Sequence, residues 1–499
     1  MHSLTRRPFC DRILYPLALG ALACATCFSS LSAAQVPNPT VTGPIVQTVA
    51  PGDSSRNYIF FSSNHDLAGH GYVEEEFFIS GTATRYATPN QTNPDSSSTG
   101  TVINPGSNNP YKTRVVVRRP SDPTKFNGVV LVEWYNVTNN FDAENIWFFG
   151  WENIMRSGYV WVGVSAQRVG VNALKTWSPT RYGTLDVTVG NTVTDDSLAY
   201  DVYSQAGQAL AAPGAVDMLH GLKPAMIIAT GESQSAQKLA AYANSIQPLA
   251  DLYDGILALS TLGNRIRTDL TIPFMKVLTE SDVVLFNEAN ARQDSPLPPL
   301  VRSWEVAGAS HVDQHLRNSR EPLELRDNGV SSEAVNLDPP YTGGSTGGCE
   351  FKPVGTRVPT TFVLASAYDK MVKWISTGTA PANSPRITIT SAPGATPVVP
   401  LRDSSGLAQG GIRLAQMVYP TRINSGVNVG PGACNRWGFS LAIDPATIAT
   451  MYPDPLAYYR GVAQVDKANT IAGYILPVDM YADMTSAAQF NITGLYDGE

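Results

Sequence analysis

Ser233 has the clearest chemical potential in this chain. An apolar segment at 226–230 runs directly into the string Gly-Glu-Ser-Gln-Ser at 231–235. Apolar residues then recur with helical spacing from Ala236 to Ala243. A nucleophile elbow consists of a strand, a sharp turn that carries one serine, and a helix, with no spacer between them. The pattern therefore predicts that Ser233 presents its hydroxyl for attack on a carbonyl carbon.

The residues that flank this serine only partly match the motif. An elbow needs small residues on both sides, because its backbone is strained and the strand and helix pack closely. Gly231 meets this need, whereas Ser235 stands where the motif has a second glycine. Serine is nearly as small, so the departure weakens the motif without removing it. The alternative is an ordinary strand-to-helix turn in which Ser233 is only a helix N-cap.

A nucleophilic serine needs a base, and we expect that base to be His311. A base must take the hydroxyl proton, and a carboxylate must orient the base. Five histidines follow residue 34: His65, His70, His220, His311 and His315. His311 comes soon after an apolar run at 301–306, where its ring can reach over the carboxyl edge of a sheet. His315 competes with it, but it comes a helical turn later and is interpreted as a surface or structural residue.

Two carboxylates compete for the role of the acid. Glu280 and Asp282 come just after an apolar run at 274–278. If the extended backbone continues, their side chains point the same way. Asp282 is favoured because the turn needs some length to bring a carboxylate behind the imidazole, and Glu280 remains a rival. Either could instead be a solvated loop carboxylate. The order serine, acid, histidine is that of α/β-hydrolases.

The oxyanion of a tetrahedral intermediate needs two hydrogen-bond donors. The backbone N–H of Gln234, the residue after the serine, is the expected first donor. The second should come from the loop after the apolar run at 128–134, which begins Tyr135-Asn136-Val137. Tyr135 or Asn136 could supply a backbone N–H, and Asn136 could instead supply its side-chain amide.

The segments around these residues predict an α/β fold. Apolar, β-branched runs are found at 113–118, 128–134, 159–166, 225–230, 255–260, 274–278 and 301–306. Most do not alternate, as expected for strands that are buried on both faces. Helical patterns lie between them, at 143–156, 196–211 and 235–246. Repeated strand-helix alternation predicts a mostly parallel sheet flanked by helices.

Long loop insertions and a C-terminal extension complete this plan. A strand is expected at 72–83, with Glu74 to Glu76 interpreted as solvated. The segment 168–195, with Trp177 and Tyr182, is expected to border the pocket, and a surface loop is the alternative for any single residue in it. The extension at 327–499 is rich in Gly, Pro and Ser, and helices are expected in it at 360–376 and 455–471. It could be a lid, a cap or part of the same domain.

Bulk composition excludes several classes of protein. The chain has 499 residues, of which 43% are hydrophobic and 15% charged, so it is globular rather than disordered. Its formal charge is −7 and it has no basic block, so a nucleic-acid partner is not expected. Residues 1–34 carry three arginines, an apolar stretch and Ser-Ala-Ala before Gln35, which predicts a cleaved secretory signal. The protein should therefore be exported, to the periplasm or the medium.

Cysteine usage agrees with export. Three of the five cysteines lie within the predicted signal, which leaves Cys349 and Cys434. An oxidising compartment favours a disulfide between these two, and two free buried thiols are the alternative. Their spacing is not that of a zinc site, and no apolar run after the signal is long enough for a stable membrane span. No metal or cofactor is expected.

The motifs together resemble the secreted α/β-hydrolase-domain proteins of the Abhydrolase_10 type. The resemblance rests on strings that begin at Gly71, Val132, Gly231, Glu280, Trp304 and Leu407. It spans most of the chain, which argues that 35–110 (arm and β region), 111–326 (catalytic core) and 327–499 belong to one α/β-hydrolase domain. It implies an α/β-hydrolase fold with a serine nucleophile. Carried over by position, it supports Ser233 and His311 and leaves Glu280 and Asp282 open.

These observations predict an exported serine esterase without a cofactor. Ser233 would form an acyl-enzyme with a small-molecule or polymeric carboxylic ester, His311 would carry the proton, and Asp282 would orient His311. An amidase or peptidase could use the same residues. A non-catalytic binding protein on a hydrolase scaffold is the alternative from another class, since a fold does not fix a function.

Overall fold

One large sheet positions the candidate residues. The computed structural model describes residues 36–293, 298–331 and 348–490. The strands of the sheet are Thr40–Thr42 (β1), Tyr72–Thr82 (β2), Pro110–Pro120 (β5), Val129–Trp134 (β6), Val160–Val164 (β7), Met226–Glu232 (β8), Gly255–Leu259 (β9), Phe274–Thr279 (β10) and Val301–Val306 (β11). Within the described residues their order is β1-β2-β5-β7-β6-β8-β9-β10-β11.

The sheet is parallel where it carries the candidate residues. From β7 through β6, β8, β9 and β10 to β11, every neighbouring pair is parallel. Strands β1, β2 and β5 pair antiparallel, and β5 joins β7 antiparallel. The carboxyl ends of the six parallel strands therefore meet at one edge, where ligands bind in open α/β sheets.

Both faces of the sheet are buried, which explains the unalternated apolar runs. In β8, Ile228 packs into one core cluster, whereas Ile227 and Ala229 pack into the other. In β6, Leu131 and Val130 divide between the two clusters in the same way. Because side chains alternate along a strand, two apolar layers favour apolar residues on both faces of each strand.

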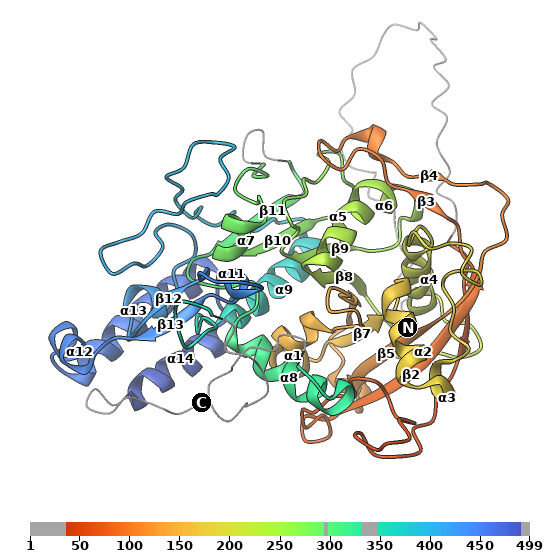
Figure 1. The fold of residues 1–499 in the computed structure, drawn as a ribbon, viewed down its shortest axis with the longest axis horizontal. Helices are drawn as coiled ribbons and strands as arrows, with labels where there is room; N and C mark the ends of the chain where they lie inside the picture. The colour runs from red at the N-terminus through yellow and green to blue at the C-terminus, as the bar shows by residue number, and fades with distance from the viewer. Residues whose placement is uncertain (1–35, 294–297, 332–347, 491–499) are drawn as a thin grey trace, which may run out of the picture. The chain divides into compact units, whose positions relative to one another are not determined.

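Helices cover both faces (Figure 1). The helices are Asn145–Arg156 (α1), Arg168–Trp177 (α2), Pro179–Tyr182 (α3), Ala199–Ala211 (α4), Gln234–Ser245 (α5), Gln247–Ala250 (α6), Glu280–Leu285 (α7), Gln314–Asn328 (α8), Thr360–Thr377 (α9), Ala415–Val418 (α10), Cys434–Trp437 (α11), Pro445–Met451 (α12), Pro455–Ala472 (α13) and Pro477–Gln489 (α14). Helices α1, α8 and α9 pack on one side, and α5 contacts β6, β8 and β9 on the other. The predicted fold class, a mostly parallel sheet flanked by helices, is confirmed.

The C-terminal extension contacts the main sheet directly. Its Ile412 continues the sheet beside the end of β11, where its N–H donates to Glu305 and its carbonyl accepts from Ala307. Among the described residues, two short ribbons lie outside the sheet, Tyr86–Ala87 (β3) with Thr101–Val102 (β4), and Arg422–Ser425 (β12) with Phe439–Ala442 (β13). The extension therefore supports the strand end from which the His311 loop leaves.

A disulfide ties the extension together. Cys349 and Cys434 are bonded, and both are buried. The predicted signal at 1–34, with its three cysteines, lies outside the described residues. Among the helices that the structure describes, none combines the length and apolar character needed to cross a membrane.

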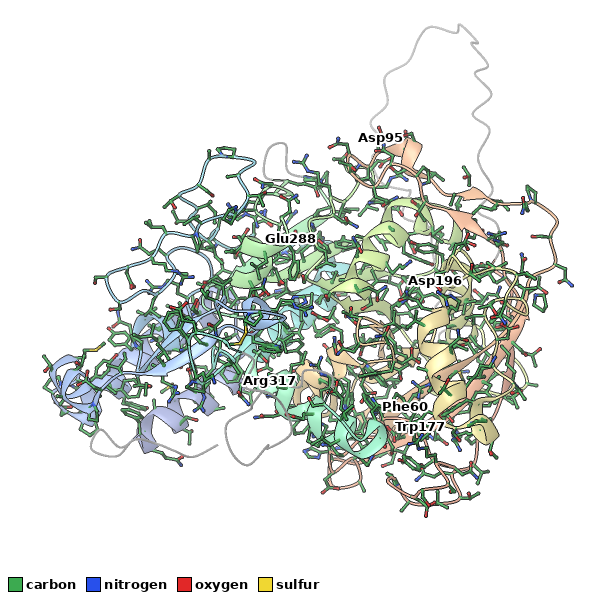
Figure 2. All side chains as sticks on the ribbon, viewed as in Figure 1. Phe60, Asp95, Trp177, Asp196, Glu288 and Arg317 are labelled. Carbon is green, nitrogen blue, oxygen red and sulfur yellow. A yellow bond between two sulfur atoms is a disulfide. The ribbon has the colours of Figure 1, made fainter. Side chains whose placement is uncertain are left out.

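The expectation that Trp177 and Tyr182 border a pocket was wrong. Much of the segment 168–195 is helical, in α2 and α3, and its aromatic residues belong to the core. The ring of Trp177 packs edge-on against Phe60, with centroids 5.1 Å apart, and the two labels lie side by side in Figure 2. Tyr182 is fully buried and donates its hydroxyl proton to Glu76. These aromatic side chains fill space beneath β2 rather than lining a pocket.

The interpretation of Glu74 to Glu76 as solvated was also wrong. Glu76 is fully buried and pairs with Arg181. Glu74 pairs with the buried Arg118 at 2.7 Å, and Glu75 pairs with Arg119 at 2.7 Å. The partners come from the neighbouring strand and from α3, so the acidic run in β2 is neutralised by contacts that are distant in sequence.

Candidate active site

Ser233 lies on a strained turn at the carboxyl end of β8. Its backbone has φ 58° and ψ −120°, a conformation that is uncommon for a residue with a side chain. Its N–H donates to the carbonyl of Leu259 at 2.9 Å, which ties the turn to β9. A Cβ on Gly231 would lie 2.9 Å from the Ser235 Oγ and 3.1 Å from Leu239, so the turn needs glycine there.

Ser235, the departure from the motif, stabilises the turn through its hydroxyl. Its Oγ donates to the carbonyl of Glu232 at 2.8 Å and accepts from the N–H of Glu232 at 3.0 Å. Sequence reasoning treated Ser235 only as a small residue. A glycine at this position could make neither hydrogen bond. Ser235 therefore fixes the backbone of the elbow through two contacts that the glycine of the motif lacks.

The structure brings His311 to Ser233. The ring Nε2 lies 2.9 Å from the Ser233 Oγ. His311 is in the loop between β11 and α8, and its N–H donates to the Ser281 Oγ at 2.6 Å. The same loop is fixed from the C-terminal extension, because the N–H of Val312 donates to the carbonyl of Arg436. His311 is therefore held at its backbone from both sides.

Asp282 lies on the other side of the imidazole. Its Oδ1 is 2.7 Å from His311 Nδ1, and its side chain is fully buried. Its Oδ2 accepts from the N–H of Thr279 at 2.8 Å, and the Thr279 hydroxyl accepts from the N–H of Asp282. This reciprocal pair is a capping box at the start of α7, so the helix cap also fixes the carboxylate that faces the histidine.

The structure does not bring Glu280 to His311. Its carboxylate accepts from Arg402 at 2.5 Å and from the N–H of Gly308 at 2.8 Å. Glu280 and Asp282 would point the same way if the strand continued past Thr279, but it ends there. Helix α7 begins at Glu280, so the two side chains point apart. Glu280 instead anchors the loop that leads to His311.

A second carboxylate, which the sequence analysis did not consider, also faces His311. The Oε1 of Glu232 lies 3.2 Å from His311 Nε2. Its Oε2 accepts from the side-chain amide of Asn145 at 2.7 Å. Asn145 is placed by the start of α1, where the buried Glu133 accepts the N–H groups of the next two residues. The only signal in the sequence is the position of Glu232 next to Ser233.

Charge around the imidazole changes its acidity. Burial alone would lower the pKa of His311, but the carboxylates of Glu232 and Asp282 outweigh burial and raise that pKa above its ordinary value of 6.5. Burial also raises the pKa of Glu232, against the opposing effect of His311. Ser233 keeps 8% of its surface exposed and His311 keeps 5%, whereas Asp282 has none. Solvent therefore contacts Ser233 and His311 but not Asp282.

Gln234 and Val137 are the candidate donors for an oxyanion. Gln234 is the first residue of α5, so its N–H has no acceptor within the helix. The N–H of Val137 points to the side-chain carbonyl of Gln234 at 3.3 Å, a long bond that a substrate oxygen could replace. The side chain of Gln234 is held by Gln167, to which it donates at 3.0 Å.

The donor groups of Tyr135 and Asn136 are used elsewhere. The N–H of Asn136 donates to the carbonyl of Ala143 at 3.0 Å, and its side-chain amide donates to the carbonyl of Glu232 at 3.0 Å. The N–H of Tyr135 donates to the carbonyl of Val164. Asn136 was therefore a wrong choice of donor, because its amide holds the backbone of the elbow, and the neighbouring Val137 is the candidate instead.

The other histidines lie outside this group of residues. His315 is on α8, and its Nε2 is 3.7 Å from a carboxylate oxygen of Glu152. His220 pairs with Glu75 at 3.1 Å, and His65 stacks on Trp151 with ring centroids 4.0 Å apart. Across the residues that the structure describes, no group of three or more His, Cys, Asp or Glu side chains is arranged to hold a metal ion.

Comparisons with known proteins agree with this architecture. The family model described as "Alpha/beta hydrolase domain" matches residues 41–484. No curated protein matches the chain. Similar solved structures include esterase Est22, with 14% identity and a TM-score of 0.32 over 53% of this chain and 80% of that chain.

Two further structures are similar over less of the chain. A dienelactone hydrolase from Anabaena variabilis has 13% identity and a TM-score of 0.27 over 44% of this chain and 90% of that chain. An alpha-beta serine hydrolase homologue from Coxiella burnetii has 15% identity and a TM-score of 0.26 over 44% of this chain and 93% of that chain. Scores this low carry no functional information.

Proposed function

This chain belongs to the alpha/beta hydrolase domain family, and from that premise we propose that it is a serine hydrolase that cleaves carboxylic esters. Ser233 is the nucleophile, His311 the general base and acid, and Asp282 the residue that orients His311. The observation that carries the proposal is the continuous chain of contacts between them, 2.9 Å from the Ser233 Oγ to His311 Nε2 and 2.7 Å from His311 Nδ1 to Asp282.

The first half of the reaction forms an acyl-enzyme. The Ser233 Oγ attacks the ester carbonyl carbon, its proton moves to His311 Nε2, and the carbonyl oxygen becomes an oxyanion. When the oxyanion collapses, the bond to the leaving oxygen breaks, and His311 returns the proton to that oxygen. Asp282 keeps the second ring proton on Nδ1, which leaves Nε2 free to accept.

Water completes the cycle. It attacks the acyl carbon, gives its proton to His311 Nε2, and the second tetrahedral intermediate releases the carboxylic acid as Ser233 recovers its proton. In both halves the oxyanion accepts from the N–H groups of Gln234 and Val137. The side-chain carbonyl of Gln234 must give up its long contact with Val137 when the oxyanion forms.

An ester and an amide of the same acyl group test the proposal. The purified chain should hydrolyse p-nitrophenyl acetate and p-nitrophenyl butyrate, and Ser233→Ala should abolish this turnover. Matched p-nitroanilides should react much more slowly, and equal turnover of both would replace the esterase with an amidase. A folded protein without turnover on either class would favour a binding role and contradict the proposal.

We also propose that the protein is exported. Support comes from residues 1–34, where arginines, an apolar stretch and a small-residue cleavage site follow each other, and from the disulfide between Cys349 and Cys434. The test is the N-terminus of the chain recovered from the periplasm or the medium. It should begin at Gln35, and an intact N-terminus found only in the cytoplasm would contradict export.

A further inference from the structure

Two oxygen atoms compete for one nitrogen of His311. Its Nε2 lies 2.9 Å from the Ser233 Oγ and 3.2 Å from the Oε1 of Glu232. The hydroxyl of Ser233 can donate to Nε2. A carboxylate cannot donate, so the Glu232 contact is favourable only when a proton lies between the two atoms.

Glu232 cannot easily turn away from the ring. Its side chain is 2% exposed, and its Oε2 accepts from Asn145 at 2.7 Å and from Asn136 at 3.4 Å. Its backbone is fixed as well, by Ser235 on both the N–H and the carbonyl and by Asn136 on the carbonyl. The carboxylate therefore faces Nε2 in every state that leaves this part of the backbone intact.

The protonation state of the His311 ring then decides whether its contact with Glu232 is attractive or repulsive. A neutral ring that accepts from Ser233 presents a lone pair at Nε2, and this repels an ionised Glu232 at 3.2 Å. A ring protonated at Nε2 attracts it. The attack of Ser233 and the attack of water both create the protonated ring, so the contact is more favourable in the transition states than in the resting state.

We propose that Glu232 is a positioning residue that acts through His311, as the second of two carboxylates that flank the imidazole and stabilise its protonated form. Asp282 binds Nδ1 throughout the cycle, whereas Glu232 binds Nε2 only when that nitrogen carries the proton. The inference rests on the proposed function, because it concerns the proton that Ser233 gives up.

Other charges face the same groups. Arg436, from the C-terminal extension, acts to lower the pKa of His311, and Arg320, from α8, acts to lower the pKa of Glu232. Against these, Glu232 and Asp282 together raise the pKa of His311. The fall in reaction rate at low pH, the acid limb of a pH profile, therefore reports the protonation of His311 and Glu232 together.

The test is the pH dependence of Ser233 labelling by a fluorophosphonate, which needs no knowledge of the substrate. In that reaction the Ser233 Oγ–P bond forms, the P–F bond breaks, fluoride leaves and His311 takes the serine proton. In Glu232→Gln the acid limb should move to lower pH by about one to three pH units, the range for loss of an adjacent opposite charge. The labelling rate on the high-pH plateau should also fall, because the protonated ring loses its partner.

Glu280→Gln is the matched control. Glu280 is also buried, but it binds Arg402 and Gly308 rather than His311. The acid limb of the Glu280→Gln labelling profile should therefore stay at the wild-type pH. Glu232→Asp keeps the charge at a greater distance and should give a shift smaller than that of Glu232→Gln. A shift that appears in Glu280→Gln to the same extent would overturn the inference, because it would reflect general damage.

The inference and the proposed function fail in different ways. An acid limb that is the same in wild type and a folded Glu232→Gln overturns the inference and leaves the esterase proposal standing. Wild-type protein that is not labelled at any pH overturns the proposed function. If Glu232→Gln does not fold, Glu232→Asp decides, because a folded Glu232→Asp variant with the wild-type acid limb overturns the inference, whereas a limb moved to lower pH supports it.

Discussion

Asp282→Asn should disable the enzyme by placing the proton of His311 on the wrong nitrogen. The Oδ2 of Asp282 accepts from the N–H of Thr279 at 2.8 Å, while Oδ1 accepts from His311 Nδ1 at 2.7 Å. An asparagine has only one acceptor oxygen. If that oxygen stays with Thr279, the NH₂ group faces Nδ1, which must then accept, so the ring proton moves to Nε2. A ring protonated there cannot take the proton of Ser233.

The opposite orientation of the amide is also unfavourable. It keeps an acceptor on His311 but places an NH₂ group against the N–H of Thr279, and a buried unpaired donor costs about 1–3 kcal/mol. The wrong-tautomer orientation should therefore dominate. A neutral amide also removes the charge that stabilises the protonated ring. Loss of the acid in serine hydrolases lowers kcat by roughly 10⁴-fold, which corresponds to about 5.5 kcal/mol of transition-state stabilisation.

The assay is kcat/KM for p-nitrophenyl acetate at the high-pH plateau, with thermal unfolding to check that each variant folds. Asp282→Asn should lose about 10³- to 10⁴-fold. Glu280→Gln, at the rival position, should lose much less, since Glu280 does not contact the ring. An Asp282→Asn variant within tenfold of wild type, or an equal loss in Glu280→Gln, would refute the assignment of the acid.

Three further outcomes are expected. The base is the neutral form of His311, and the pKa of His311 is raised above 6.5. The value of kcat/KM should therefore rise with pH through a midpoint above 6.5, and activity should be lost below that midpoint. A midpoint under 6.5 would contradict the effect of the two carboxylates on His311. Gly231→Ala should destabilise the protein by about 1–3 kcal/mol in urea unfolding and lower kcat, because the added Cβ meets Ser235 and Leu239. Gly214→Ala, where a Cβ meets nothing within 4 Å, is the control and should change neither quantity. Replacing Cys349 and Cys434 by serine should cost about 2–5 kcal/mol of unfolding free energy, and a reductant should lower the stability of wild type but not of the double variant.

Local patterns predicted the elements of the fold well. The run before Gly231 became β8, and the helical spacing after Ser235 became α5, because both signals lie within a dozen residues of each other. The unalternated runs became the buried strands of the sheet. The amphipathic signal of α2 was present, since Val171, Leu174 and Trp177 are buried at intervals of three, but it was interpreted as a loop.

The choice of acid illustrates a signal that could have been used. Thr279-Glu280-Ser281-Asp282 has the spacing of a capping box, which predicts a helix start and separates the two carboxylates. A continued strand would place both side chains on one face, so Asp282 was favoured over Glu280 only because of the length of the turn. Recognising Thr279 as an N-cap would have given a second reason to favour Asp282, the cap partner.

Other features could not be predicted from local sequence. The amide of Asn136 turns toward the backbone of Glu232, 96 residues away, and only the assembled sheet brings the two together. The direction of the Glu232 side chain toward His311 depends on Asn145, at the start of α1. The arginine partners of Glu76 likewise come from other elements, so burial of that carboxylate had no signal in its own strand.

Whether Ser233 is the nucleophile can be measured by peptide mass spectrometry after reaction with a fluorophosphonate. The label should be found on Ser233, should be absent in Ser233→Ala, and should form much more slowly in a folded His311→Ala variant. A label on another serine, or no label on a folded wild-type protein, would contradict the assignment of Ser233 as the nucleophile.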